Sequence, residues 1–430
     1  MLNRQRAARR SRLRTFPTTP RTVTPVSTRT TETTTVQAFP WIGLLTLAGA
    51  IFVSVTSEFL PTGLLPEMAD ELGVSLSTAG LLVTVFAGTV VIATTPLAAL
   101  TRKYSRKGLV VVVLGVIALA NLLAAIAPTY EFLVGARVLG GLAHGLFWAV
   151  VAAYSAHLVP KHQLGKAVAI TSGGASAAFV LGVPVGTALG HAMGWRFAFA
   201  AIAVTVVLLG VLVIKFLPAV NHHVTLKTGE VAIPLYRDRS ISGVILLCFV
   251  IVILITGQNT FYTYIAPWLV DVAGFPETSV AFLLFLFGGA GAIGLVLAGF
   301  ASDRFPKRGF ALAIGSMMLA IAVLAAWSAN SVVVVIAFVV WGVAFGGVPA
   351  MLQTRMLHTA SFRTRDLAAA LQTTAFNVGI GGGALLGGIL LDRTGIASLP
   401  VAQIVFLAIA LTLMVVTDAM RSARARRLHS

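Results

Sequence analysis

Charged residues are scarce in this sequence. Only 10% of its 430 residues are Asp, Glu, Lys or Arg, whereas 57% are hydrophobic, and the mean hydropathy is +0.93. A soluble domain carries about 25% charged residues. The composition therefore excludes a soluble domain and predicts that most of the surface faces lipid. Short segments of alternating polarity, which are typical of a membrane β-barrel, are missing as well. We therefore predict an all-α membrane protein.

Cysteine and the sequence patterns of catalytic sites are also lacking. Cys248 is the single cysteine, so no intrachain disulfide can form. The chain has no Walker A motif, no metal-ligand spacing of Cys and His, and no convincing catalytic triad. The acidic residues Glu67, Asp70 and Glu71 lie next to a predicted helix end and are interpreted as solvated loop residues. We predict that the protein is not an enzyme and that it uses no cofactor and no metal.

Long apolar runs fill most of the chain after residue 38. A run of about 20 apolar residues crosses a bilayer as a helix, and a helix satisfies its own backbone in lipid. Twelve such runs are predicted, at residues 41–65, 77–100, 108–127, 131–157, 167–190, 196–217, 241–266, 279–301, 310–328, 331–354, 367–391 and 398–419. Residues 1–38 are rich in Arg, Thr and Pro and are predicted to be a disordered basic tail.

The positions of the basic residues predict the topology. The net charge is +17, which in a soluble chain would suggest nucleic-acid binding. With a cytoplasmic N-terminus, however, nearly all Lys and Arg residues fall on the inner side, and the outer loops hold only Arg196 and Arg393. We predict a plasma (inner) membrane protein with both termini cytoplasmic, and no nucleic-acid partner.

The chain contains an internal repeat. An offset of 201 residues (267 − 66) aligns Pro66 with Pro267 and, without a gap, a series of further glycines and basic residues. Parallel repeats of six spans are typical of transporters, whose substrate site lies between the repeats near the membrane midplane. We predict an N-terminal six-helix bundle at 39–217, a cytoplasmic linker at 218–239 that contains His222 and His223, a C-terminal bundle at 240–420 and a basic tail at 421–430.

One acidic residue lies well inside a predicted span. A charge at the position of Glu58 costs several kcal/mol unless it is paired or protonated, so such residues are functional by default. Arg137 is expected at a similar depth in another span, where the two side chains could meet. Our hypothesis is that Glu58 couples transport to protons, that Arg137 tunes it, and that His144 relays protons. A static ion pair and a structural histidine are the alternatives.

Polar and aromatic residues of three spans are candidates for substrate contacts. They would form a mostly apolar cavity with a few hydrogen-bonding points, which suits a neutral or amphiphilic ligand with hydroxyl groups. For Phe147 and Trp148, packing is an equally good interpretation. The candidate substrate-binding residues are Phe147, Trp148, Gln258, Asn259, Tyr262, Tyr264, Gln372, Phe376 and Asn377.

Several motifs resemble those of the major facilitator superfamily. The loop Gly299–Arg308 is similar to the family's signature between spans 8 and 9, and its first-half equivalent keeps Arg106 and Lys107 but has Arg102 where the family usually has Asp. The segment 137–141 resembles the family's span-4 motif, and 182–186 resembles its antiporter motif. The resemblance implies gating roles, with Asp303 as a latch against a helix N-terminus or, alternatively, a tight charged turn. The candidate gating residues are Asp303, Arg304, Lys307, Arg308, Arg106, Lys107, Gly182, Pro184 and Gly186.

Within this superfamily, the chain resembles the sugar efflux and chloramphenicol-resistance exporters among the drug:proton antiporters. The segments that carry the resemblance are 56–59, 63–66, 143–148, 181–186, 194–196, 262–265 and 376–379. The resemblance covers about residues 40–420 and implies proton-coupled efflux of sugars or amphenicol-like drugs by alternating access, and so a contribution to antibiotic resistance.

Other functions stay open at this point. An uncoupled carrier or an uptake carrier of a small solute is the first alternative, and a membrane receptor that transports nothing is the second. The expected partners are a small-molecule substrate, protons and the lipid bilayer, and we expect a monomer.

Overall fold

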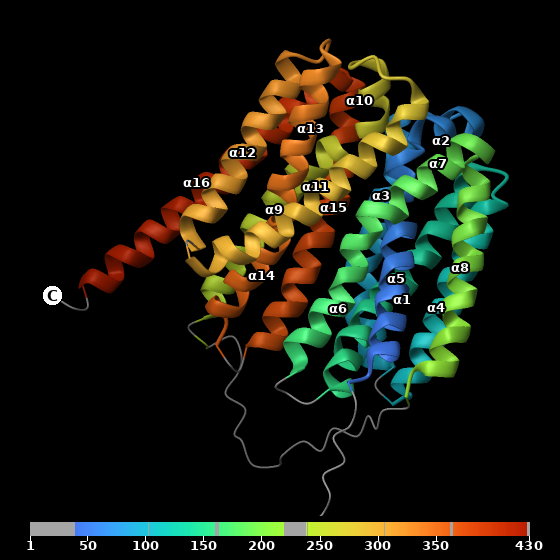
Figure 1. Cartoon of the computed structure of the whole chain (residues 1–430), viewed down its shortest axis with the longest axis horizontal. Helices are drawn as coiled ribbons and strands as arrows, with labels where there is room; N and C mark the ends of the chain where they lie inside the picture. Colours follow the sequence, from blue (N-terminus) through green and yellow to red (C-terminus); the bar gives the residue numbers. More distant parts are fainter. Residues whose placement is uncertain are drawn as a thin grey trace, which may run out of the picture. The chain divides into compact units, whose positions relative to one another are not determined.

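The computed structural model describes residues 39–101, 103–159, 163–218, 238, 240–304, 306–361 and 364–427. Within these ranges every regular element is a helix (Figure 1). In this described part of the chain, twelve helical segments are long and apolar enough to cross a membrane, which confirms the predicted all-α fold with twelve spans. The N-terminal tail and most of the predicted linker, with His222 and His223, lie outside the described residues.

The two halves of the chain have equivalent spans, but the fourth span is one helix in the first half and two in the second, and the fifth span is divided in the first half only. The first half contains α1 (Trp41–Gly63), α2 (Leu65–Leu72), α3 (Leu76–Leu100), α4 (Arg106–Ala125), α5 (Tyr130–Leu158), α6 (Leu164–Ala177), the π-helical segment η2 (Ala178–Gly182), α7 (Val183–Met193) and α8 (Trp195–Phe216). The second contains α9 (Ile241–Tyr262), α10 (Ile265–Asp271), α11 (Glu277–Arg304), α12 (Pro306–Ala326), α13 (Ser331–Gly346), α14 (Val348–Thr359), α15 (Arg365–Thr394), the 3₁₀ turn η4 (Ile396–Ser398) and α16 (Leu399–Arg427).

The first long helix of each half breaks at nearly the same position. α1 ends at Gly63 and is followed by α2, and α9 ends at Tyr262 and is followed by α10. Pro66 and Pro267 lie in the first turn of the short helices. Backbone N–H groups in a first turn have no partner within the helix, so proline costs no hydrogen bond there. The predicted spans 41–65 and 241–266 therefore extend slightly too far. α16 also reaches Arg427, so part of the predicted C-terminal tail is helical.

Glycines with positive φ mark equivalent turns in the two halves. Gly73 and Gly274 have φ of 64° and 71°, and Gly194 and Gly395 have φ of 91° and 81°. Each pair is separated by the same 201 residues (274 − 73 and 395 − 194). Residues other than glycine rarely adopt a positive φ. The repeat found in the sequence is therefore also present in the backbone of the loops.

Equivalent glycines also set the helix packing. A Cβ atom at Gly141 would lie 2.7 Å from the carbonyl oxygen of Phe86, and one at Gly342 would lie 2.6 Å from that of Phe287. α5 and α3 in the first half, and α13 and α11 in the second, therefore pack backbone to backbone. Small residues at helix contacts permit this close approach in membranes.

The π-helical segment η2 interrupts the fifth span just before its proline. Pro184 has no N–H to donate within the helix, and a wider π turn is one way in which a helix accommodates such a gap. Around η2, Gly174, Gly182 and Gly186 pack against Ala48, Thr56 and Leu60 of α1 with no room for a Cβ atom. This part of the span is therefore held closely against α1.

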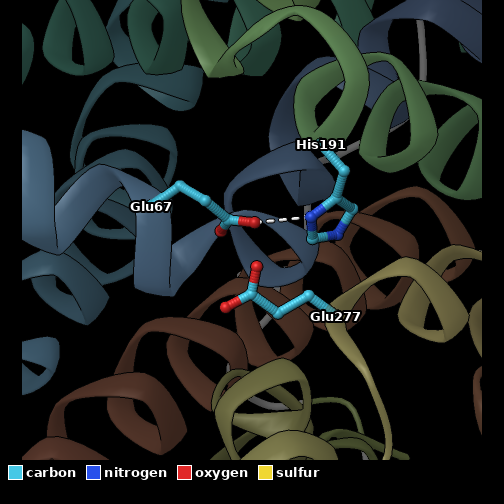
Figure 2. A group of neighbouring side chains, drawn as sticks. All are labelled: Glu67, His191 and Glu277. Atoms are coloured by element: carbon cyan, nitrogen blue, oxygen red, sulfur yellow. Dashed lines mark ion pairs between the residues drawn. The ribbon is translucent and has the colours of Figure 1, made fainter.

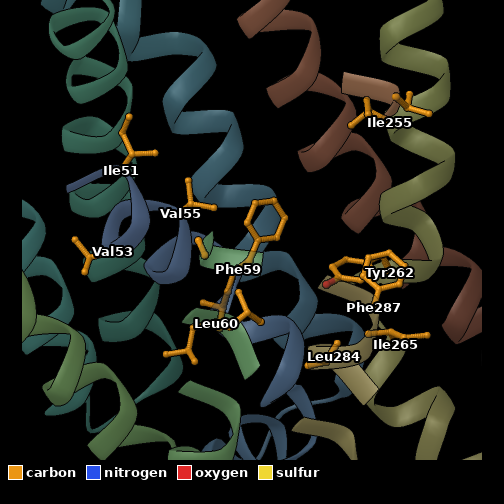
Figure 3. Packing of buried hydrophobic residues seen from close by; sticks show 14 of the residues in the cluster. Ile51, Val53, Val55, Phe59, Leu60, Ile255, Tyr262, Ile265, Leu284 and Phe287 are labelled. Carbon is orange, nitrogen blue, oxygen red and sulfur yellow. The ribbon is translucent and has the colours of Figure 1, made fainter. Parts of the chain in front are cut away.

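The two halves make close contacts at the end that holds α2 and α10, here named the α2–α10 end. The charge distribution predicts that this end faces outward. Thr84 donates a hydrogen bond of 3.0 Å to the carbonyl oxygen of Gly381, and the ring of Tyr264 fills the space beside Gly80. Figure 3 shows buried side chains of α1, among them Phe59, and those of α9 to α11, among them Tyr262.

Candidate functional site

Two helices position a group of polar side chains inside the first half. Ser54 and Glu58 lie one turn apart on α1, and His144 and Trp148 lie one turn apart on α5, so each pair occupies one helix face. Arg137 lies two turns before His144 on α5. Glu58, Arg137 and His144 are 5%, 3% and 3% exposed, so each must find its polar partners inside the protein.

His144 is the centre of this group. Its Nδ1 lies 2.9 Å from Ser54 Oγ, and its Nε2 accepts a hydrogen bond of 2.8 Å from the indole N–H of Trp148. The same Nε2 lies 3.3 Å from Glu58 Oε2. An imidazole nitrogen carries either one proton or one lone pair, so Trp148 and Glu58 compete for the same position.

Arg137 reaches the same turn of α1 but contacts its backbone. Its two terminal nitrogens donate to the carbonyl oxygens of Ser57, at 2.9 Å, and of Glu58, at 3.0 Å. Pro61 explains the first contact, because it lacks the N–H that would bond to the Ser57 carbonyl four residues earlier. The guanidinium group also lies 4.2 Å from the ring centroid of Phe86. Among the described residues, the ion-pair contact of the Glu58 carboxylate is to His144.

Several residues of this network were missed by sequence reasoning. Ser57 Oγ donates to Asn121 Oδ1 at 2.9 Å, and Asn121 Nδ2 donates to the carbonyl oxygen of Ile117 at 2.8 Å. Ser54, Ser57 and Asn121 are buried polar residues within apolar spans. Ser57 and Ser54 precede Glu58 on α1 by one and four residues, a spacing that was a signal in the sequence.

The second-half candidates do not form a single group. Gln258 accepts hydrogen bonds from Trp341 Nε1, at 3.0 Å, and Gln403 Nε2, at 2.8 Å, inside the second half. Tyr262 packs against Phe287, with ring centroids 5.1 Å apart. Tyr264 instead donates 2.9 Å to the carbonyl oxygen of Ala384, close to the contact between the halves.

The remaining candidates for substrate contact lie on α5, α9 and α15. Asn259 and Asn377 each donate a 3.0 Å hydrogen bond to the carbonyl oxygen four residues earlier. The Asn377 carbonyl oxygen Oδ1 is buried and has no hydrogen-bond partner among the described residues. Gln372, Phe376 and Trp148 are half-buried, whereas Phe147 is fully buried and packs against Trp148. The predicted substrate contacts therefore stay a prediction.

The candidate gating residues fall into two groups. Gly182, Pro184 and Gly186 lie at η2 and the start of α7, in contact with or next to α1. Lys107 donates 2.8 Å to the carbonyl oxygen of Ile214, Arg106 begins α4, and Arg308 is exposed on α12. The side chains of Asp303, Arg304 and Lys307 lie outside the described part of the chain, so the predicted latch stays a prediction.

Comparisons with known proteins agree with this architecture. Residues 47–380 and 247–427 match the profile of the Major Facilitator Superfamily. The chain is 31% identical over 377 residues to a probable sugar efflux transporter of Pasteurella multocida (strain Pm70). The alignment covers 87% of this chain and 92% of that protein.

Solved structures with the same fold are more distant in sequence. A bacterial homologue of the human lysosomal transporter Spinster, in an inward-facing and occupied conformation, matches with a TM-score of 0.73 at 14% identity, over 89% of this chain and 97% of that one. The human organic anion transporter MFSD10 matches with a TM-score of 0.67 at 13% identity, over 87% and 99% of the two chains. These likenesses show the fold alone.

Proposed function

The chain belongs to the major facilitator superfamily, and on that premise we propose that it exports small hydroxylated organic molecules in exchange for protons. As a member of this family it is a multi-pass inner-membrane transporter and not an enzyme. The exported molecules we propose are sugars or amphenicol-like drugs. The single observation that carries the proposal is the buried contact of 3.3 Å between Glu58 Oε2 and His144 Nε2.

A proton changes the hydrogen bonds of this contact. Without it, Glu58 Oε2 and His144 Nε2 are both acceptors, and the Trp148 indole N–H occupies the lone pair of Nε2. A proton bound between Oε2 and Nε2 turns their contact into a hydrogen bond and displaces the indole N–H. Trp148 is half-buried, so proton uptake alters a side chain that is itself a candidate for substrate contact.

Ser54 and Arg137 hold the two partners in place. Ser54 fixes the imidazole through Nδ1, and Arg137 fixes the turn of α1 that carries Glu58. The positive charge of Arg137 also makes the buried carboxylate less costly. Arg137 therefore acts as a positioning residue, and the exchangeable proton belongs to Glu58 and His144.

Two arguments support export of a hydroxylated solute. The relative from Pasteurella multocida, which aligns over most of the chain, is described as a probable sugar efflux transporter. One proton moving down a driving force of about 150 mV supplies roughly 3.5 kcal/mol, which sustains a gradient of about 300-fold. One proton per cycle is therefore sufficient for useful export.

The test uses inside-out membrane vesicles with a preset proton gradient and a pH-sensitive dye. Sugars and amphenicols are added one at a time to vesicles that contain wild-type protein or the Glu58→Gln variant. The matched control is Glu131→Gln, because Glu131 is an exposed glutamate in the first turn of α5. We expect a substrate-triggered proton flux in wild type and control and none in Glu58→Gln. Equal flux in all three proteins would refute coupling at Glu58.

A carrier without proton coupling is the second candidate. It is favoured by the fact that Arg137 contacts backbone carbonyls, as a purely structural residue would. Substrate movement that is measured with labelled sugar, equal with and without a proton gradient, would select this alternative.

A further inference from the structure

Three side chains that the proposed mechanism does not use converge at the α2–α10 end (Figure 2). Glu67 comes from α2, His191 from α7 and Glu277 from the first turn of α11. His191 Nδ1 lies 2.6 Å from Glu67 Oε1, and one ligand atom from each of the three residues lies within 4.8 Å of the other two. Since α11 belongs to the second half, the group joins the two halves.

Glu67 is not a solvated loop residue, so that interpretation of the sequence was wrong. The side chains of His191 and Glu67 are 12% and 25% exposed. Apart from the contact between them, neither carboxylate oxygen of Glu67 nor His191 Nε2 has a hydrogen-bond partner among the described residues, although all three atoms are buried. Buried polar atoms are normally satisfied by a partner, and one imidazole contact leaves most of this carboxylate unsatisfied.

We propose that Glu67, His191 and Glu277 bind a divalent transition-metal ion of the Zn²⁺ type, which holds the two halves together at the α2–α10 end. One imidazole nitrogen and carboxylate oxygens are ligands that Zn²⁺ accepts at about 2.0–2.2 Å. Around a tetrahedral ion with these distances, ligand atoms lie about 3.3 Å apart. The contact between Glu67 and His191 therefore opens by less than about 1 Å, and a water molecule completes the coordination.

The ion would favour one conformation of the transporter. Glu277 lies close to Glu67 and His191 only while the halves are in contact at this end, where Tyr264 also fills the space beside Gly80. A ligand shifts a conformational equilibrium by its differential affinity for the two states. Bound Zn²⁺ therefore opposes opening at this end, whichever substrate the protein carries.

The first experiment measures Zn²⁺ binding to the purified full-length protein in detergent by isothermal titration calorimetry. We expect one ion per chain. Loss of an outer-shell partner weakens metal binding roughly 10–100-fold. Glu277 is a proposed direct ligand, so Glu277→Gln should weaken Zn²⁺ binding at least as much. Glu277 is exposed, so this change leaves the packing intact. The matched control is again Glu131→Gln, an exposed glutamate in the first turn of another helix, which should bind Zn²⁺ like wild type.

The second experiment measures opening of the α2–α10 end. Ser77 is 7% exposed and lies against Gly388 of the second half. A Ser77→Cys protein in a Cys248→Ala background carries one thiol that a maleimide reaches when the end opens. We expect Zn²⁺ to slow labelling of this protein severalfold. The same protein with Glu277→Gln added should be labelled at the same rate with and without Zn²⁺. Because the thiol is present in both proteins, direct binding of Zn²⁺ to it would slow both equally.

Two results would overturn the inference. Equal Zn²⁺ affinity in wild type and Glu277→Gln, or no binding in either, would leave only an ion pair between Glu67 and His191. Labelling that is unchanged by bound Zn²⁺ would refute the bridging role. Neither readout uses a transported substrate, so both are independent of the outcome for proton-coupled export.

Discussion

The two halves of the protein share an arrangement of spans and differ in what fills their centre. In the first half, the centre holds Ser54, Glu58, Arg137 and His144 in one hydrogen-bonded network. At the positions 201 residues later stand Ile255, Asn259, Phe338 and Phe345. The glycine contacts that set helix packing are the same in both, so the change of chemistry needs no change of fold.

The second half replaces the network with aromatic packing. The rings of Phe261 and Trp341 stack with centroids 5.3 Å apart, and Phe338 packs edge-to-face on Trp341 at 5.6 Å. Each such pair contributes about 0.5–1.5 kcal/mol beyond its buried area, without any group that titrates. Under the proposed function, the first half therefore carries the proton chemistry, and the equivalent positions of the second half carry none.

The largest expected difference between the two halves is at Glu58 and its counterpart Asn259. Glu58→Gln removes the proposed exchangeable proton, and we expect proton-coupled exchange to fall by about a hundredfold, equivalent to about 2.7 kcal/mol. Asn259→Ala removes only a hydrogen bond to the carbonyl oxygen of Ile255 and should change coupling by about twofold at most. Proton flux per substrate in vesicles measures both. Loss of coupling in Asn259→Ala alone would reverse the assignment of the two halves.

The next largest effect concerns Arg137 and Pro61. Arg137→Gln leaves the Ser57 carbonyl without a donor, and we expect the free energy of unfolding to fall by about 1–3 kcal/mol. Pro61→Ala restores a backbone N–H for that carbonyl, so the double variant should recover part of the loss. Thermal unfolding of the purified proteins gives the coupling energy of this cycle. Strictly additive effects would contradict the proposed link.

A smaller effect is expected from Trp148→Phe. The change keeps an aromatic ring but removes the N–H that binds the His144 Nε2 lone pair. Since this bond favours the unprotonated nitrogen, its loss should move the midpoint of the transport pH profile to higher pH. A hydrogen bond of about 0.5–1.5 kcal/mol corresponds to a shift of roughly half to one pH unit. An unchanged profile would show that the indole does not compete with Glu58.

The smallest effect tests the second half alone. Trp341→Phe removes the hydrogen bond to Gln258 Oε1 and should lower the free energy of unfolding by about 0.5–1.5 kcal/mol. Proton flux per substrate should stay unchanged, because no titrating group is involved. A change in this ratio would mean that the aromatic cluster takes part in coupling.

The sequence predicted the fold well because hydropathy is a local signal and because the repeat can be found by comparing the sequence with itself. Span positions follow from runs of apolar residues, and the pairing of Pro66 with Pro267 is a matter of counting. Glu58 was identified because a lone acid in an apolar span is costly wherever it points. The site partners were harder, since the rotation of α1 against α5 decides that His144 rather than Arg137 meets the carboxylate.

Two other features depended on contacts that spacing does not show. Pro61 and Ser57 are four residues apart, so the orphaned carbonyl was foreseeable, but the residue that fills it was not. Glu67, His191 and Glu277 are far apart in the chain and meet only where the two halves touch. Sequence distance therefore hid the second candidate site completely.

The π-helical segment η2 also fixes the phase of the span that contains it. Small residues recur every four positions from Gly174 through Ala178, Gly182 and Gly186, a period that drifts by about 40° per step on an α-helix of 3.6 residues per turn. A π turn absorbs roughly one residue, or about 100°, of that drift. The same residues in a regular α-helix would therefore turn α7 about its axis and carry His191 away from Glu67.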